Sequence, residues 1–351
     1  MTQKIEDAYQ ALVRPFAVAK CDLDNAFLFN NFPLVLKFGS LFRKIDPDFF
    51  TTFGKNCFAG PFPFGHECVA EVIEIGDKVT KIKVGDVVSV PFQISCGKCL
   101  NCSSGITSSC ENTPKISTYG FGKHLQFGGA MSDLLNVPFA DEMLLKIPEN
   151  INPIHLASLS DNVPDAYKNV GYELEKDPNK SILVIGGSAQ SVGLYTVLIA
   201  KSMAARKVDY VDINEERLNV AKKIGVDNIF ESYNSIRDKY DIVVDASSSE
   251  KGLKMAIDRT KPYGICTSSG IYFKKTTMPL MKMYTSGITF KTGLANARTD
   301  AEKVLELVNQ NKLNLELVTT KLDNWDNATN AFLSKTSKVI VTRERINKTG
   351  T

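Results

Sequence analysis

The stretch SILVIGGSAQSVG at positions 181–193 decides the fold of this chain. Ser181 to Ile185 is an apolar run typical of a strand, and Val192 to Ala204 is long and apolar enough for a packed helix. A glycine-rich turn between strand and helix is the context that a phosphate-binding loop requires, because the unpaired N–H groups of a helix N-terminus attract anions. We therefore expect a dinucleotide to bind here. The expected contact residues are Gly186, Gly187, Ser188, Val192 and Gly193.

A second strand-like run, Val208 to Asp212, ends nineteen residues after Gly193. A carboxylate at that position can accept hydrogen bonds from an adenosine ribose and repel a 2′-phosphate, which favours NAD over NADP. Arg217 is the nearby cation that could swing in to offset a 2′-phosphate, so we count it among the cofactor-binding residues. A glycine-rich turn that binds no cofactor is the alternative.

Strands and helices keep alternating downstream of this turn. We expect helices near Glu215 to Ile224 and Lys251 to Asp258, and strands at Tyr240 to Asp245 and Gly264 to Ser268. This alternation predicts a parallel, doubly wound sheet. Upstream, residues 1–145 contain short apolar runs broken by Gly, Pro and Asp, which predict the strands of a compact barrel or meander.

The length of 351 residues exceeds what one hydrophobic core usually holds, so two domains are expected. We place a first domain at 1–163, a nucleotide-binding domain at 164–295, and a C-terminal segment at 296–351 that returns to the first domain. Basic residues number 42 against 39 acidic ones and form no long run, which argues against a nucleic-acid partner. No apolar run approaches the ~20 residues of a membrane span and the first residues lack a signal peptide, so we expect a cytoplasmic protein without a membrane partner.

Four of the eight cysteines form a C-x2-C-x2-C-x7-C series within a lobe at about 94–112. They are Cys96, Cys99, Cys102 and Cys110. Such steps let four thiolates converge on one tetrahedral zinc ion. A closed thiolate shell leaves no position for substrate, so this zinc is expected to be structural. An iron–sulfur cluster or unligated thiols are the alternatives.

Further candidate ligands are scattered: Cys21, His66 and Asp161, with Glu67 beside the histidine. Taken singly, each has an ordinary explanation as a semi-buried thiol, a core histidine or a helix cap. Sequence spacing alone does not join them.

The order of the motifs resembles that of a known family. Gly65, His66 and Glu67 are followed by the four-cysteine lobe, by Ser158 to Asp161 and by the strand end at Asp212. This order is similar to that of the zinc-containing medium-chain dehydrogenase/reductase family, nearest its formaldehyde dehydrogenase-like and sugar dehydrogenase branches. The resemblance runs from roughly residue 16 to 342. It implies a GroES-like β-barrel catalytic domain joined to an α/β Rossmann domain, and a homodimer or homotetramer.

The resemblance also implies roles for the scattered residues. Cys21, His66 and Asp161 would bind a second, catalytic zinc and leave a fourth position for the alcohol oxygen. Alcohol dehydrogenase is the known example of a catalytic zinc bound by two cysteines and one histidine. With Asp161 in place of one cysteine, this site would be a variant of that ligand set. Glu67 would lie beside the zinc or bind it occasionally, and Asp24 would orient the ligands. The implied reaction is hydride transfer between a small-molecule alcohol and NAD, with zinc as Lewis acid.

Three departures from the family pattern bear on substrate and proton transfer. Leu23 stands where a Ser or Thr usually starts the proton's exit, which leaves Asp22 or Asp24 as the nearest titratable groups. Asp165 and Ala166 replace the usual Thr-Gly pair. The insertion 27–64 holds eleven of the 20 phenylalanines, and we expect it to form an apolar wall of the cleft, a subunit interface or extra core.

Two other functions stay open at this point. One is a non-catalytic NAD(H)-binding redox sensor or structural protein on the same fold. The other is a zinc-ribbon module in which the cysteine lobe binds a protein or nucleic acid.

Overall fold

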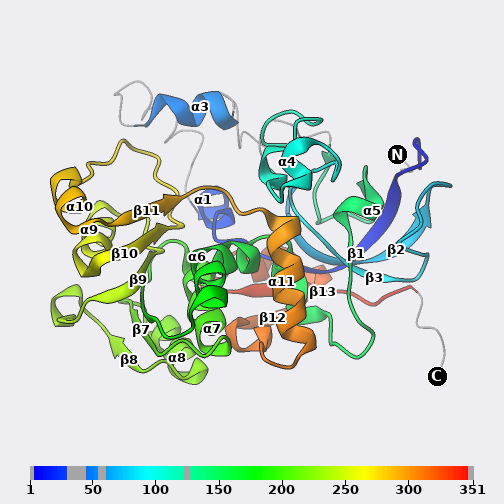
Figure 1. Cartoon of the computed structure of the whole chain (residues 1–351). Helices are drawn as coiled ribbons and strands as arrows, with labels where there is room; N and C mark the ends of the chain where they lie inside the picture. Colours follow the sequence, from blue (N-terminus) through cyan, green and yellow to red (C-terminus); the bar gives the residue numbers. More distant parts are fainter. Residues whose placement is uncertain (1–3, 30–44, 54–60, 122–126, 347–351) are drawn as a thin grey trace.

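The structure is a computed structural model that describes residues 4–29, 45–53, 61–121 and 127–346. Two sheets lie on opposite sides of a central group of helices (Figure 1). These central helices are α6 (Asn162–Lys176), α7 (Gln190–Ser202) and α11 (Ala297–Asn309). No helix in the described ranges is long and apolar enough to cross a membrane.

The first sheet has seven strands in the described part of the chain and is built from both ends of the sequence. Its strands are β1 (Ala11–Ala19), β2 (Glu67–Ile75), β3 (Val87–Val90), β4 (Leu135–Val137), β5 (Leu145–Lys146), β12 (Lys321–Asn324) and β13 (Val339–Thr342). Their order is β12-β13-β1-β2-β3-β5, with β4 paired to β1. Strand β1 pairs antiparallel with β2 on one side and with β13 on the other, so the C-terminal strand joins the N-terminal sheet.

The second sheet contains six parallel strands among the residues that the structure describes, as the alternation of strands and helices predicts. They are β6 (Ser181–Ile185), β7 (Lys207–Val211), β8 (Asn228–Phe230), β9 (Tyr240–Asp245), β10 (Thr260–Ser268) and β11 (Thr289–Thr292). The order β11-β10-β9-β6-β7-β8 is that of a dinucleotide-binding sheet, in which the chain reverses its direction of growth between β6 and β9. Ligands bind at the carboxyl ends of the strands beside such a reversal.

Helices α8 (Glu215–Ile224), α9 (Glu250–Arg259) and α10 (Leu280–Ser286) complete this domain. Their starts follow from the sequence: Asn214 caps α8 and Ser249 caps α9, each accepting a backbone N–H in the first turn. The shorter helices are α1 (Asp24–Phe29), α3 (Pro47–Phe53), α4 (Leu100–Ser103), α5 (Ala140–Met143) and α12 (Ala328–Phe332). Segments of 3-10 helix lie at Thr107–Ser109, Ile154–Ser160, Tyr233–Ser235, Leu315–Val318 and Trp325–Asn327.

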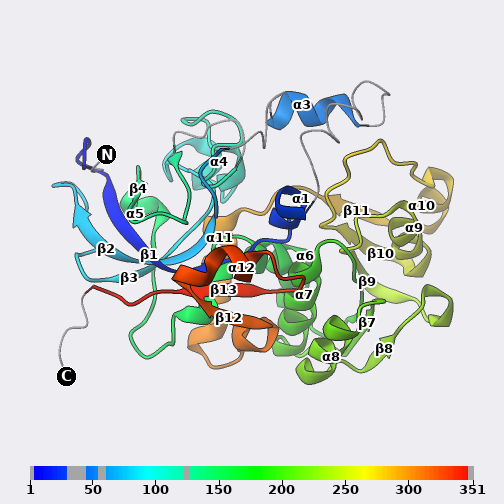
Figure 2. The same ribbon diagram turned by 180° about the vertical axis from the view of Figure 1, so that it is seen from behind.

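One hydrophobic core joins the two sheets. Phe16 and Ala19 of β1 belong to the same buried cluster as Val163 of α6, Leu194 of α7 and Val304 of α11. Figure 2, the view from behind, shows β13 running between the two halves. Because α6 begins at Asn162, it crosses the boundary that we place at 163, and the exact domain limits stay a prediction.

The buried carboxylate of Asp209 offers a test of the parallel sheet. Tyr240 donates its hydroxyl to Asp209 Oδ2 at 2.6 Å, and Asp209 is fully buried. We expect Tyr240→Phe to lower the free energy of unfolding by about 1–3 kcal/mol, because it leaves a buried acceptor without this donor. Urea denaturation measures the loss. Tyr9→Phe is the control, since Tyr9 is 44% exposed and lies outside the parallel sheet, so the same change there should have no effect.

Candidate catalytic and cofactor-binding cleft

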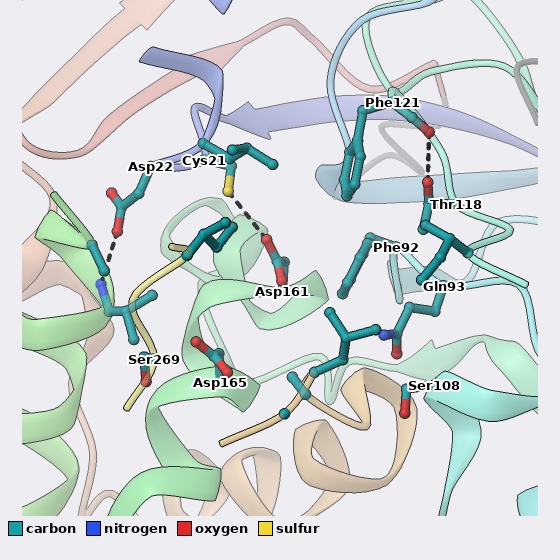
Figure 3. A pocket seen from close by; sticks show the side chains of 18 of the residues that line it. Cys21, Asp22, Phe92, Gln93, Ser108, Thr118, Phe121, Asp161, Asp165 and Ser269 are labelled. Atoms are coloured by element: carbon teal, nitrogen blue, oxygen red, sulfur yellow. Dashed lines mark hydrogen bonds between the residues drawn. The ribbon is translucent and has the colours of Figure 1, made fainter. Parts of the chain in front are cut away.

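A cleft opens between the two sheets, and the predicted site residues converge on it. Its walls include Cys21, His66, Phe92 and Asp161 from the N-terminal part of the chain, and Gln190 and Phe273 from around the parallel sheet. In Figure 3 the sulfur of Cys21 points toward Asp161, whereas the carboxylate of Asp22 extends away from both. The cleft therefore has a region around Cys21 and a separate region beside α7.

The structure brings Cys21, His66 and Asp161 together, although they lie far apart in the sequence. Cys21 follows β1, His66 immediately precedes β2, and Asp161 lies between the 3-10 turn Ile154–Ser160 and α6. One ligand atom from each residue lies within 4.8 Å of the others. Asp161 Oδ2 is 3.2 Å from Cys21 Sγ and 3.2 Å from His66 Nε2. The pairing of β1 with β2 positions Cys21 and His66. The hydroxyl of Ser160, the neighbour of Asp161, hydrogen-bonds to the backbone N and O of Cys68 and so positions Asp161.

The chemistry of this group suits a zinc ion. Burial raises the pKa of the Cys21 thiol well above its ordinary value, and the neighbouring Asp161 carboxylate raises it further. Burial alone would lower the pKa of His66, but Asp24 and Asp161 raise it. A buried thiolate next to a carboxylate needs a cation, and sulfur, imidazole and carboxylate are ligands that zinc accepts. These three residues leave a tetrahedral ion one free position, as a catalytic site requires.

Asp24 lies behind His66, where it can orient the ring. Its Oδ2 accepts the N–H of Cys21 at 2.9 Å, and its Oδ1 is 3.9 Å from His66 Nδ1. Both Oδ1 and Nδ1 are buried without a hydrogen-bond partner. A small shift of the ring toward Asp24 would pair them and fix the ring with Nε2 facing an ion. Burial raises the pKa of Asp24 to about 6.

Glu67 faces away from the group and makes a different set of contacts. Its Oε1 accepts the N–H of Asn162 at 2.9 Å. Its Oε2 accepts from Ser158 Oγ at 3.1 Å and from Lys338 Nζ at 2.5 Å. Glu67 and Lys338 are both fully buried. Glu67 therefore lies beside the group of ligands and not within it.

Asn162 and Lys338 belong to the site, and our sequence analysis did not select them. In the amide orientation that satisfies its neighbours, Asn162 donates to Asp161 Oδ2 at 3.0 Å and accepts from Lys338 at 3.2 Å and Ser191 at 2.7 Å. The position of Asn162 directly after a candidate ligand was the available signal. Lys338 begins the final strand-like run, and nothing in its sequence context marks it as buried.

The four-cysteine lobe closes around a common centre, as its spacing predicts. Ligand atoms of Cys96, Cys99, Cys102 and Cys110 lie within 4.8 Å of one another. Backbone N–H groups point at the sulfurs: Cys99 N and Lys98 N at Cys96, Glu111 N and Cys102 N at Cys99, and Cys96 N at Cys110. Donors of this kind stabilise thiolates, and those from Glu111 and Cys102 lower the pKa of Cys99 to about 6. The arrangement suits a closed structural zinc.

The glycine turn after β6 lies at the reversal of the parallel sheet. A Cβ on Gly187 would come within 2.5 Å of Ser247 Cα, in the loop after β9. A Cβ on Gly186 would come within 2.2 Å of Asp212 Oδ2. Both glycines are therefore required by close approach, and Asp212 at the end of β7 reaches over the turn.

Arg217 is already paired with Asp212. Its Nε and Nη2 donate to the two carboxylate oxygens at 2.6 and 2.8 Å, and the Tyr210 hydroxyl donates to Oδ2 at 2.8 Å. Arg217 lies in the first turn of α8 and therefore already stands beside Asp212. Its movement toward a 2′-phosphate stays a prediction.

Asp22 contacts the first turn of α7, a contact that the sequence did not suggest. Its carboxylate accepts from Ser191 N at 2.9 Å, Val192 N at 3.1 Å and Ser191 Oγ at 3.0 Å. We considered Asp22 as a route for the proton because it follows Cys21. Its carboxylate is instead hydrogen-bonded to the N-terminus of α7. Burial raises the pKa of Asp22 to about 6.

Aromatic side chains form one wall of the cleft. Phe121 meets the His66 ring edge-to-face with centroids 4.7 Å apart, and Phe92 lies 5.8 Å from the same ring. Phe49 of α3 packs on Phe273, which follows β10, with centroids 5.4 Å apart. Phe49 also shares a buried cluster with Phe92 and Phe121, so α3 touches both halves of the molecule. Positions 30–44 and 54–60 of the insertion, including Phe32 and Phe38, lie outside the described residues.

Comparison with known proteins matches both halves of the chain. Residues 42–149 match the family model of the alcohol dehydrogenase GroES-like domain, and residues 191–310 match that of zinc-binding dehydrogenases. A probable D-xylulose reductase A of Aspergillus clavatus is 27% identical over 286 residues, covering 78% of this chain and 76% of that protein. A zinc-type alcohol dehydrogenase B of Aspergillus flavus is 26% identical over 281 residues, covering 74% of this chain and 63% of that protein.

Solved structures agree with these matches. The alcohol dehydrogenase TADH from Thermus sp. ATN1 superposes with a TM-score of 0.80 and 24% identity, over 97% of this chain and 94% of that one. At this identity the likeness establishes the fold. Since both domain models match in order and the predicted two-domain fold is confirmed, the chain belongs to the zinc-containing medium-chain dehydrogenase/reductase family.

Proposed function

We propose that this protein is a zinc-dependent oxidoreductase that transfers hydride between an alcohol and NAD. The observation that carries the proposal is the convergence of Cys21, His66 and Asp161 in the cleft that the glycine turn of the Rossmann domain borders. The curated relatives bear the names D-xylulose reductase and zinc-type alcohol dehydrogenase, which supports a polyol, sugar or simple alcohol as substrate.

Each residue of the site has a distinct task in this reaction. Zinc supplies Lewis acidity and NAD accepts or returns the hydride. Cys21, His66 and Asp161 would hold the ion and leave one position for the alcohol, while Asp24 fixes the His66 ring. Phe92 and Phe121 exclude water from the His66 side. Leu23 lines the cleft without a hydroxyl, so the proton of the alcohol leaves by a route other than this side chain.

We also propose that the protein acts as a homo-oligomer in the cytoplasm. Beside β11, the edge strand of the parallel sheet, Tyr263, Leu280, Met281 and Tyr284 are 67–88% exposed. The Tyr263 ring lies against the end of α10, since a Cβ on Gly287 would come within 2.8 Å of it. A second copy is the occupant that the resemblance implies for this apolar patch. The seven described cysteines form no disulfide, which supports a reducing compartment.

The metal assignment predicts about two zinc ions per chain, one of which exchanges under mild chelation. A closed four-thiolate shell is harder to open than a mixed site with a free position. Cys21→Ser should lose only the exchangeable ion and its alcohol oxidation, whereas Cys68→Ser is the matched control, because Cys68 is buried nearby but outside the ligand group. Elemental analysis after dialysis measures both. Retention of two ions and full activity by Cys21→Ser contradicts the catalytic site.

The preference for NAD over NADP should depend on the pair formed by Asp212 and Arg217. Asp212→Ser removes the charge that repels a 2′-phosphate and frees Arg217 to bind it, so kcat/KM with NADP should rise at least about tenfold. The double variant Asp212→Ser/Arg217→Gln should lose that gain. This result would show that the gain comes from binding of the 2′-phosphate by Arg217 and not only from removal of the Asp212 charge. Equal kcat/KM for the two cofactors in the wild type would count against the preference.

The aromatic wall should favour larger apolar alcohols over ethanol and small polyols. Phe53 and Phe273 line the cleft, and Phe→Ala at either position should erode this preference by about 1–3 kcal/mol in relative kcat/KM, because each removes apolar contact area. Substrate series and light scattering are measured together. The Phe variants should keep the wild-type mass, whereas Met281→Glu should lower the mass and leave substrate preference unchanged. Indifference to substrate size combined with dissociation of the Phe53→Ala variant would move the insertion to the subunit interface.

A further inference from the structure

At the N-terminus of α7 the chain supplies an anion of its own to the cleft, the carboxylate of Asp22. The carboxylate of Asp22 accepts the N–H groups of Ser191 and Val192 and the Ser191 hydroxyl. These N–H groups belong to the first turn of a 13-residue helix. Ala189, the residue before α7, provides no side-chain cap. Asp22 thus caps α7 across 169 positions of sequence and from the other half of the molecule.

The same N–H groups are the ones that a dinucleotide diphosphate needs. In a strand, glycine turn and helix at the reversal of a parallel sheet, the diphosphate lies against the first turn of the helix. A carboxylate and a phosphate cannot accept from these donors together, because they would share the same space and repel each other. The charge of Asp22 therefore stands where the charge of the cofactor would be stabilised.

The neighbouring amide groups of the turn also have partners. Ser188 N bonds Ser247 O at 3.3 Å and Ala189 N bonds Ala246 O at 3.1 Å. The glycine turn is thereby held against the loop after β9, whereas the N–H groups of Ser191 and Val192 in the first turn of α7 are bound by the Asp22 carboxylate. Displacing Asp22 is then the direct way to provide donors for a diphosphate.

We propose that Asp22 is an internal competitor of the cofactor diphosphate: it must leave the N-terminus of α7 before a dinucleotide binds fully, and so sets cofactor affinity. This inference rests on the proposed function. Asp22 directly follows Cys21, so the residue that moves when the cofactor binds is the chain neighbour of a proposed metal ligand. When no cofactor is present, the contact of Asp22 with Ser191 and Val192 caps α7 and joins the two halves of the molecule.

The test is the affinity of the zinc-loaded, full-length protein for NADH, measured by isothermal titration calorimetry without alcohol. Asp22→Ala should lower the Kd for NADH at least about tenfold, since both the competing acceptor and its charge are gone. Asp22→Asn keeps an amide oxygen that can cap α7 and removes only the charge, so its Kd should fall by a smaller factor. It also serves as the conservative variant if Asp22→Ala does not fold, which circular dichroism and thermal melting show.

Asp141 provides a matched control. Its carboxylate accepts Thr80 N, Lys81 N and the Thr80 hydroxyl, the same set of donor types, at a site outside the cleft. Asp141→Ala should therefore leave the Kd for NADH at the wild-type value. Adenosine, which carries no phosphate, should bind the wild type and Asp22→Ala equally, because Asp22 competes only with the diphosphate.

The outcomes separate this inference from the proposed function. If the wild type binds NADH and both Asp22 variants bind it no more tightly, or if adenosine gains as much as NADH, the inference is overturned and the proposed function stands. If the Asp22 variants bind NADH more tightly but no alcohol is oxidised in any form, the inference stands and the proposed function fails. If neither the wild type nor the variants bind NADH, both fail.

Discussion

The buried ion pair of Glu67 and Lys338 is the contact on which the rest of the site depends. Glu67 is the first residue of β2 and directly follows His66, whereas Lys338 directly precedes β13 near the C-terminus. The ion pair therefore joins two distant parts of the chain. The second oxygen of Glu67 holds Asn162, the residue after Asp161. Burial would lower the pKa of Lys338, but Glu67 raises it above its ordinary value, so the lysine stays charged. Removing one partner would leave the other charge buried and unpaired, which typically costs 3–5 kcal/mol, or about half of a domain's stability.

A second constraint is the reversal of strand order between β6 and β9. It places the glycine turn against the loop after β9 so closely that Gly187 has no space for a side chain. The same reversal directs the N-terminus of α7 toward the end of β1, where Cys21 and Asp22 follow each other. The Cys21 side chain turns to the metal ligands and the Asp22 side chain to the helix. The two chemical centres of the molecule therefore share one stretch of backbone.

Local patterns in the sequence were sufficient where the physics is local. The parallel sheet followed from apolar runs alternating with helical periods, and β7, α8 and β9 lie within a residue or so of their expected limits. The cysteine lobe followed from spacing, because four ligands within fifteen residues have few ways to fold around one ion. Asp212 was identifiable because a carboxylate at the end of the second strand has one geometric position relative to the turn.

The sequence by itself thus determined the fold class, the family and the identity of the candidate ligands, since these rest on short-range periodicity and motif order. Only the tertiary structure decided what those residues touch. It brought Cys21, His66 and Asp161 to one point, turned Glu67 away to Lys338 and placed Asp22 on α7. Contacts between residues 91 to 271 positions apart depend on how two sheets pack across a common core. No local pattern encodes the direction in which a side chain turns once that packing is made.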